Sequence, residues 1–270
     1  MITSSSNSQI KNIIQLQKKS KTRTEQGAFV TEGIKMFEES KDGGYLIKAY
    51  VSEMYYNEKL AEDAEYFKGF PYEVVADGVL KEASDTLTPQ GIMAIVKKPV
   101  YDLDKIITDS HANLLLLEDI RDPGNLGTII RTAEGAGFTG IIISKTSVDM
   151  YNPKVIRSTM GAIYRMPFIY VEDFKQTLNQ IKRNHIPVYA AHLNTDYNYD
   201  EVNYPEKCAI LIGNEANGLS DEIADMSDQY VKIPMEGSVE SLNAAIAAAI
   251  LMYEVYRQKR KNNQDSGTLE

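Results

Sequence analysis

Short, continuous runs of apolar residues mark the second half of the chain. They are the segments NLLLLEDI, GIIISK, PVYAAHL and CAILIGN, which begin at Asn113, Gly140, Pro187 and Cys208. Polar stretches of helical character separate one run from the next. Strands of a parallel sheet have this pattern because helices bury both faces of the sheet. The pattern therefore predicts a parallel α/β domain.

The first half of the chain has a different pattern. Ile10, Ile13 and Ile14 are spaced for one face of a helix over 8–19. A basic turn and a short strand are expected in KTRTEQGAFVTEG, then a helix over about 34–40 that Gly43-Gly44 ends. The segments YLIKAYVS, FPYEVV and IMAIVKK predict further strands. These elements predict a smaller α/β unit over 1–98, then a linker over 99–110.

The second domain is expected over 111–262, with a polar, disordered tail over 263–270. Its last helix is predicted from about Glu240 to Lys261. The predicted apolar stripe of that helix consists of Leu242, Ile246, Ala249, Ile250 and Tyr253. The many alanines between these residues allow another backbone to approach closely.

Composition excludes several classes of protein. The single cysteine excludes a disulfide scaffold and a cysteine-cluster metal site, and it favours a reducing compartment. The three histidines form no HExxH motif, so no metal is expected. The apolar runs are too short to cross a membrane, and the amino terminus has no hydrophobic signal core. We therefore expect a cytoplasmic protein.

Charge is distributed unevenly along the chain. The net charge of −9 argues mildly against a nucleic-acid partner. Residues 1–24, however, carry five basic side chains and no acidic one, whereas residues 196–240 carry eleven acids and two bases. Such asymmetry can present a basic face to a phosphate backbone, although ordinary solvated surface charge explains it equally well.

One apparent motif is rejected. Gly135, Gly137 and Gly140 spell G-x-G-x-x-G, the dinucleotide-binding fingerprint. That fingerprint requires a strand before it and a helix after it, whereas here a helix precedes and a strand follows. These glycines are expected to end a helix.

Three segments carry candidate chemistry. In EDIRDPGNLGTIIRTAEGAG (118–137), Asn125 is expected to cap a helix, and Arg131 follows about a turn and a half later. In LIGNEANGLS (211–220), Glu215 follows a buried strand, where ligands collect in parallel sheets. In VKIPMEGSVESLNAAIAAAI (231–250), Ser241 and Asn243 begin a helix. Taken singly, these segments are equally well explained as an ordinary turn with a surface arginine, a polar turn and a helix cap.

Together with NPKVIRSTMGA (152–162), the segments have the order and spacing of a known family. Over about 110–260 the chain resembles the SpoU-type (TrmH-like) RNA ribose 2′-O-methyltransferases of the SPOUT superfamily. The stretch KTRTEQGAFVTEGIK resembles the start of that family's L30e-like RNA substrate-binding domain. One departure is Ala245, where many members carry serine.

The resemblance implies a fold and a cofactor. The fold would be α/β, with a carboxyl-terminal parallel-sheet domain containing a trefoil knot and a smaller L30e-like α/β domain before it. S-adenosylmethionine would contact Gly213, Ile233 and Leu242, with Ala191 and Leu193 in a second wall.

The resemblance also implies a reaction, the transfer of a methyl group to a ribose 2′-hydroxyl. Its catalytic residues would be Asn125, Arg131, Glu215, Ser241 and Asn243. Arginine stays protonated in proteins, so we assign Arg131 to a phosphate clamp rather than to a general base. Asn125, Ser241 and Asn243 would hold the hydroxyl and position the methyl donor. Glu215 is left with three alternatives, namely the cofactor's ammonium group, Arg131 or a dimer interface.

The implied partners are RNA and a second copy of the chain. The family works as homodimers with the site near the subunit seam, and this domain arrangement is typical of enzymes that modify ribosomal RNA, here most simply the large-subunit 23S rRNA. Phosphate contacts are expected from Lys18, Lys21, Arg23, Arg157 and Arg165. The alternatives are a tRNA substrate, a non-catalytic RNA-binding member of the fold, or an unrelated α/β enzyme that acts on a small molecule.

Overall fold

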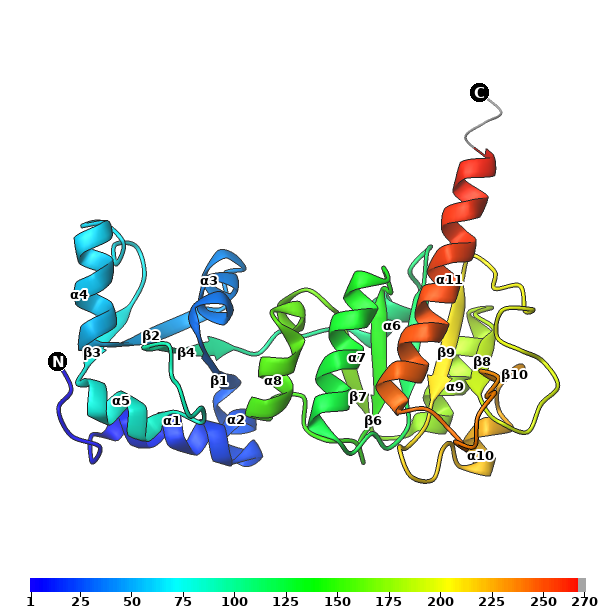
Figure 1. Ribbon diagram of the computed structural model, residues 1–270, viewed down its shortest axis with the longest axis horizontal. Helices are drawn as coiled ribbons and strands as arrows, with labels where there is room; N and C mark the ends of the chain where they lie inside the picture. The colour runs from blue at the N-terminus through cyan, green and yellow to red at the C-terminus, as the bar shows by residue number, and fades with distance from the viewer. Residues whose placement is uncertain (267–270) are drawn as a thin grey trace. The chain divides into compact units, whose positions relative to one another are not determined.

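The computed structural model describes residues 1–266, with side chains as far as residue 262 (Figure 1). The chain divides into two compact units. Unit 1 comprises Met1–Val100 and Asp149–Tyr164, and unit 2 comprises Tyr101–Val148 and the chain from Arg165 onwards. The expected domain boundaries stay a prediction. The division differs from them in assigning 149–164 to unit 1 and most of the expected linker to unit 2.

Unit 1 contains a four-stranded sheet in the order β1-β4-β2-β3. Strand β4 is antiparallel to both of its neighbours, whereas β2 and β3 are parallel. The predicted strands of the first half are thereby confirmed. The strands are β1 (Ala28–Glu32), β2 (Leu46–Ser52), β3 (Tyr72–Val75) and β4 (Ile92–Lys97).

The helices of unit 1 include the predicted first helix, whose Ile10 and Ile13 are fully buried. Residues 20–26 were expected as a turn, and this expectation is wrong, because they form a helix that Gly27 ends with φ = 58°. Lys, Arg, Glu and Gln in this segment are good helix formers, and glycine accepts the left-handed conformation at little cost. The helices are α1 (Ser8–Lys18), α2 (Ser20–Gln26), α3 (Ile34–Asp42), α4 (Glu53–Glu62), α5 (Asp77–Ala83), α8 (Pro153–Thr159) and the 3-10 helix η1 (Ala162–Tyr164).

The segment 149–164 is fixed within unit 1 by a partly buried ion pair. Arg23 is 4% exposed, and its guanidinium donates to the Asp149 carboxylate at 2.6 Å and to the carbonyl of Leu16 at 2.7 Å. The Tyr164 hydroxyl donates to the carbonyl of Met36. The NPKVIRSTMGA motif therefore belongs structurally to the amino-terminal unit.

Unit 2 contains a six-stranded sheet in the order β10-β8-β9-β5-β6-β7, and every neighbouring pair is parallel. The predicted parallel sheet and its four predicted strands are confirmed. Two short strands at the edges, β7 and β10, were not predicted. The strands are β5 (Asn113–Leu117), β6 (Gly140–Ser144), β7 (Phe168–Val171), β8 (Val188–Ala191), β9 (Cys208–Ile212) and β10 (Gln229–Val231).

Helices cover both faces of this sheet (Figure 1). On one face, Leu114, Leu116 and Leu211 pack in one core with residues of α6, α9 and α10. Helices α7 and α11 pack against each other, and α11 also contacts β9. Helix α7 ends at Gly135 and β6 begins at Gly140, which confirms that the glycine-rich stretch ends a helix. The helices are α6 (Leu103–Ile107), α7 (Pro123–Gly135), α9 (Phe174–Arg183), α10 (Asp221–Ala224) and α11 (Ala244–Ser266).

The last helix starts later than predicted and buries a face other than the predicted stripe. It begins at Ala244 rather than near residue 240, and it continues to Ser266, so only 267–270 of the expected tail lie outside the described residues. The predicted apolar stripe is not the face that packs within unit 2, because Ile246 is 50% and Tyr253 48% exposed. The residues buried instead are Ala248, Leu251, Met252 and Val255. Because this helix is apolar on several faces, its periodicity fits both the predicted stripe and the face that is buried.

No helix among residues 1–266 is both long and apolar enough to cross a bilayer. The trefoil knot stays a prediction.

Candidate active site

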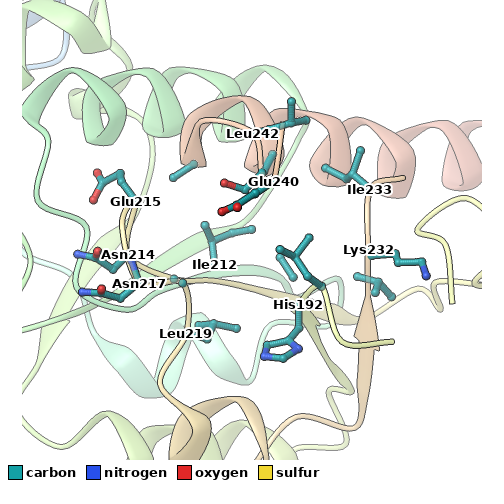
Figure 2. Close-up of a pocket in the computed structure, with 18 of the residues that line it drawn as sticks. His192, Ile212, Asn214, Glu215, Asn217, Leu219, Lys232, Ile233, Glu240 and Leu242 are labelled. Carbon is teal, nitrogen blue, oxygen red and sulfur yellow. Dashed lines mark hydrogen bonds between the residues drawn. The ribbon is translucent and has the colours of Figure 1, made fainter. Parts of the chain in front are cut away.

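A cavity of about 390 Å³ opens at the carboxyl edge of the unit 2 sheet. It is enclosed by the segments that follow β8, β9 and β10 and by the start of α11. In Figure 2, Leu242 and Glu240 lie on one side of the cavity, with Leu219 and His192 on the other. This edge is where open parallel sheets bind ligands, because successive loops converge there.

The residues expected to contact a cofactor all line this cavity. Ala191 and Leu193 come from the segment after β8, Gly213 from the end of β9, Ile233 from the segment after β10, and Leu242 from the approach to α11. Four separate chain segments thus meet at one cavity, as the motif order implied. Their contacts with a cofactor stay a prediction.

The structure shows why glycine is needed at position 213. A Cβ atom at this position would lie 2.3 Å from the backbone of Gly218 and Leu219. Asn214 and Gly218 exchange backbone hydrogen bonds of 2.9 Å, so the loop closes directly over Gly213. The glycine is needed for loop closure beside the cavity, whereas the sequence suggested a close approach to ligand.

Replacing Gly213 with alanine is expected to displace this loop. The clash is with backbone, which cannot move aside as a flexible side chain can, so we expect a loss of about 1–3 kcal/mol in the free energy of unfolding. Chemical denaturation measures this loss, and calorimetry with S-adenosylmethionine should show weakened binding. Gly237, which has no atom within 4 Å of its Cβ position, is the matched control for alanine substitution. Equal stability of the two variants would contradict the assignment.

Asn243 connects helix α11 to helix α7. Its Oδ1 accepts from the backbone N–H of Ala245 at 2.9 Å and of Ile246 at 3.3 Å, which caps α11. Its Nδ2 is thereby turned toward α7 and donates to Asn125 Oδ1 at 2.9 Å. The cap thus fixes the orientation of both amides. Because Asn243 Oδ1 is occupied by the cap, Asn243 presents Nδ2 to Asn125, and Asn125 must present Oδ1 in return.

Glu215 completes the chain of hydrogen bonds. Asn125 Nδ2 donates to Glu215 Oε1 at 3.0 Å, and the backbone N–H groups of Asp122 and Arg121 donate to the same carboxylate at 3.0 and 3.1 Å. Burial raises the pKa of Glu215, but these hydrogen bonds lower it by more, so its pKa lies below the usual 4.5. We call Asn243, Asn125 and Glu215 the amide relay.

The helix cap predicted at Asn125 is wrong. Asp122 caps α7, accepting from the Asn125 backbone N–H at 2.8 Å, and Pro123 begins the helix. Because Asp122 takes the capping role, the Asn125 side chain is free to join Asn243 and Glu215. None of the three roles expected for Glu215 includes this clamp on the start of α7.

The other two candidate catalytic residues are placed differently. Ser241 is exposed and lines the cavity. Arg131 is exposed on α7, and no group of residues 1–262 forms a hydrogen bond or ion pair with its side chain. The structure therefore brings Asn125, Glu215 and Asn243 into contact, places Ser241 beside the cavity and leaves the Arg131 guanidinium available.

Sequence reasoning missed Asp119 and Asn214. Asp119 has φ = 56°, a left-handed conformation that is uncommon outside glycine. Asn214 Nδ2 donates to the Asp119 backbone oxygen at 2.8 Å and to its carboxylate at 3.2 Å. The available signal was their position directly beyond two adjacent parallel strands, β5 and β9.

The expected RNA contacts divide into three groups. Lys18 and Lys21 are exposed on α1 and α2. Arg157 pairs with Asp85 at 2.7 Å, and Arg165 pairs with Glu134. The expectation for Arg23 is wrong, because its buried guanidinium binds Asp149 and backbone carbonyls within unit 1.

Ala245, the departure from the family pattern, is 3% exposed in the first turn of α11. Its backbone N–H binds Asn243, so its role in the cap does not depend on a side chain. The missing hydroxyl leaves the amide relay intact.

Comparison with known proteins finds relatives for both parts of the chain. Residues 112–253 match the model of the SpoU rRNA Methylase family, and residues 7–94 match the MRM3-like substrate binding domain. A 23S rRNA (guanosine(2553)-2′-O)-methyltransferase, RlmP of Bacillus subtilis, is 29% identical over 94% of this chain and 98% of its own length.

Solved structures resemble both units. The SpoU methyltransferase AviRb from Streptomyces viridochromogenes, in complex with the cofactor AdoMet, aligns with a TM-score of 0.85 and 27% identity over 94% of this chain and 98% of its own. An AdoMet-bound rRNA methyltransferase from Sinorhizobium meliloti aligns with a TM-score of 0.82 and 29% identity over 95% and 97% of the two chains.

Proposed function

The chain belongs to the SpoU rRNA Methylase family, and from this premise we propose that it transfers a methyl group from S-adenosylmethionine to a ribose 2′-hydroxyl of large-subunit ribosomal RNA. The observation that carries the proposal is the amide relay at the edge of the cavity. It joins all three family segments that the sequence singled out as carrying chemistry, over separations of 118 and 90 residues.

The cavity has the character that this cofactor requires. Its apolar walls, including Ile212, Leu219 and Leu251, suit an adenine ring and the carbon chain of a methionine group, and its volume of about 390 Å³ is typical of small-molecule sites. The Glu240 carboxylate on its lining suits a cationic ligand. Gly213, Ile233, Leu242, Ala191 and Leu193 would hold the cofactor. When bound, S-adenosylmethionine supplies a methyl group on a positively charged sulfur.

The residues around the cavity have separate tasks. Arg131 has a free guanidinium that can bind a phosphate group in two parallel hydrogen bonds and so orient the nucleotide. Asn125 Nδ2 has a second hydrogen besides the one that it donates to Glu215, and Ser241 has a hydroxyl group. Both groups can therefore form hydrogen bonds with the ribose. Glu215 is a weak base that already accepts three hydrogen bonds, so we assign it to positioning Asn125 rather than to accepting the hydroxyl proton.

RNA would be held chiefly through phosphates. Lys18 and Lys21 are exposed, and Arg157 and Arg165 can exchange a surface carboxylate for a phosphate at little cost, because exposed ion pairs are weak. The match of residues 7–94 to a substrate binding domain supports this use of unit 1. The 23S rRNA activity named for the Bacillus subtilis relative supports ribosomal RNA as the substrate.

We also propose that the protein acts as a homodimer whose interface includes the exposed face of α11. Ile246, Tyr253 and Tyr256 are 50%, 48% and 41% exposed on this face, so it forms an apolar surface. The same helix lines the cavity with Ala244 and Ala247, so this interface would lie beside the active site.

Replacing Tyr253 with glutamate is expected to convert the dimer to monomers, because it places a charge in an apolar interface. Analytical ultracentrifugation measures the change, and we expect the dissociation constant to rise at least about a hundredfold. An exposed apolar residue of unit 1, changed in Met54→Glu, is the control. A Tyr253→Glu protein that dimerises like the wild type would exclude this face.

The proposed activity is tested directly by incubating the protein with unmethylated 23S rRNA and labelled S-adenosylmethionine. Methyl transfer to a 2′-hydroxyl protects the adjacent phosphodiester from alkali, so the product is mapped as an alkali-resistant linkage. Label that enters RNA without such protection would assign the methyl group to a base. Absence of transfer to 23S rRNA, tRNA and total RNA would refute the proposal.

A further inference from the structure

Arg121 lies beside the amide relay and has no task in the proposed function. It stands in the turn between β5 and α7, where its backbone N–H donates to Glu215 at 3.1 Å. Its side chain is 65% exposed, and its Nε donates to Asp119 Oδ1 at 2.7 Å. Within residues 1–262, nothing else hydrogen-bonds to its guanidinium. The two terminal nitrogens are therefore available to a ligand.

The residue that holds Arg121, Asp119, is itself fixed through its backbone and its carboxylate. The Asp119 backbone N–H donates to Ser144 Oγ at 2.8 Å, and Asn214 Nδ2 binds both the Asp119 backbone oxygen and Oδ2. In Figure 2, Asn214 lies at the end of the cavity where Glu215 is found. Ser144 and Asn214 come from the ends of β6 and β9, so Asp119 is anchored to two strand ends besides its own.

This anchoring is difficult to explain by stability alone. Asp119 is in a left-handed conformation, which is strained for a residue other than glycine. The contact that it gains with Arg121 is an exposed ion pair, which contributes little to stability. Strain of this kind persists where it positions a group for binding or chemistry.

The geometry limits the ligand. With Nε bound to Asp119, the guanidinium presents its two terminal nitrogens side by side, an arrangement that fits two oxygens of one phosphate group. Arg121 lies four positions before Asn125, and both bind Glu215. We propose that Arg121 binds a phosphodiester of the RNA chain next to the nucleotide that enters the site, and that Asp119 positions it.

This inference rests on the proposed function, and it adds a contact to the RNA chain that is separate from Arg131. Arg121 precedes α7, whereas Arg131 lies more than two turns inside that helix. The two arginines can therefore contact different phosphates, one at each side of the reacting ribose.

Two variants separate phosphate binding from a structural role. Arg121→Gln keeps an N–H donor at the same number of bonds from Cα, so it can still bind Asp119, but it lacks the charge and the paired terminal nitrogens. Arg121→Ala removes both contacts. Arg183→Gln is the control, because this exposed arginine ends α9 at the opposite edge of the sheet and undergoes the same change in charge.

The experiment measures methyl transfer to a 23S rRNA transcript, together with RNA affinity as a function of salt concentration. For Arg121→Gln and Arg121→Ala we expect KM for RNA to rise about tenfold while kcat changes by less than about threefold. The slope of log affinity against log salt should fall by about 1, as for the loss of one phosphate contact. Affinity for S-adenosylmethionine and the melting temperature of Arg121→Gln should match those of the wild type.

The outcomes distinguish this inference from the proposed function. A wild-type protein that transfers no methyl group refutes the proposed function itself. An active wild type, with Arg121→Gln unchanged in KM and salt slope, overturns the role of Arg121 alone. Impairment of Arg121→Ala with full activity in Arg121→Gln would show that the contact with Asp119 is structural, and this too would overturn the proposal.

Discussion

Replacing Arg131 with alanine is expected to abolish methyl transfer while leaving cofactor affinity nearly unchanged. The side chain is exposed on α7 and does not line the cavity, so its loss removes no cofactor contact. If it orients the nucleotide through a phosphate, its loss misplaces the reacting hydroxyl, and we expect kcat/KM to fall at least about a hundredfold. Labelled transfer to 23S rRNA measures the first effect, and calorimetry with S-adenosylmethionine measures the second.

Arg131→Lys is the informative companion to this variant. Lysine keeps the positive charge but cannot form two parallel hydrogen bonds to one phosphate, so we expect it to restore only a minor part of the activity. Full activity in Arg131→Ala would remove this residue from the mechanism. Full activity in Arg131→Lys alone would show that charge, and not bidentate geometry, is what the reaction needs.

The sequence was sufficient to predict the parallel sheet because each central strand is a short apolar run buried on both faces, as Leu114 to Leu117 illustrate. It was insufficient at the edges. Strand β10 has only three residues, Gln229–Val231, too few to show a period. The sequence also gave no sign that 149–164 would group with unit 1, because that grouping depends on distant contacts such as Arg23 with Asp149.

The sequence predicted which residues belong to the candidate site but not which hydrogen bonds join them. Motif order identified Asn125, Glu215 and Asn243, and the structure brings their side chains into one chain of hydrogen bonds. Which end of each amide faces which neighbour follows from the caps of two helices, and the sequence had assigned the cap of α7 to Asn125 instead of Asp122. The position of Asp119 just beyond β5 was visible in the sequence, but its left-handed backbone conformation was not, because no residue type reveals it.

Replacing Glu215 with glutamine is expected to disrupt the amide relay. The carboxylate accepts from the backbone N–H groups of Arg121 and Asp122 and from Asn125. A glutamine offers one oxygen and turns an NH₂ group toward donors, which leaves at least one of them unpaired at a cost of about 1–3 kcal/mol. We expect a lower melting temperature and at least about a tenfold loss of methyl transfer, because Asn125 is no longer held.

The matched control for this substitution is Glu118→Gln. Glu118 lies at the same sheet edge and accepts from the backbone and hydroxyl of Ser220 at 2.9 and 2.6 Å, but it binds no member of the relay. Its replacement should cost less than half of the stability lost in Glu215→Gln. Equal losses of unfolding free energy in the two variants would show that any carboxylate at this edge contributes equally. The amide relay would then have no stabilising role of its own.

The pH dependence gives an independent check on the charged state of Glu215. Burial raises the pKa of this carboxyl, yet the hydrogen bonds that it accepts bring the pKa below the 4.5 of the unfolded chain. The unfolded state therefore binds more protons near that pH, so this group stabilises the fold fully above about pH 4.5 and its contribution disappears as the pH falls through the lower, folded value. The difference in unfolding free energy between the wild type and Glu215→Gln should accordingly be constant near neutral pH and shrink below about pH 4.5. A difference that stays constant down to pH 3 would mean that the carboxylate charge is not what holds the start of α7 and Asn125 in place.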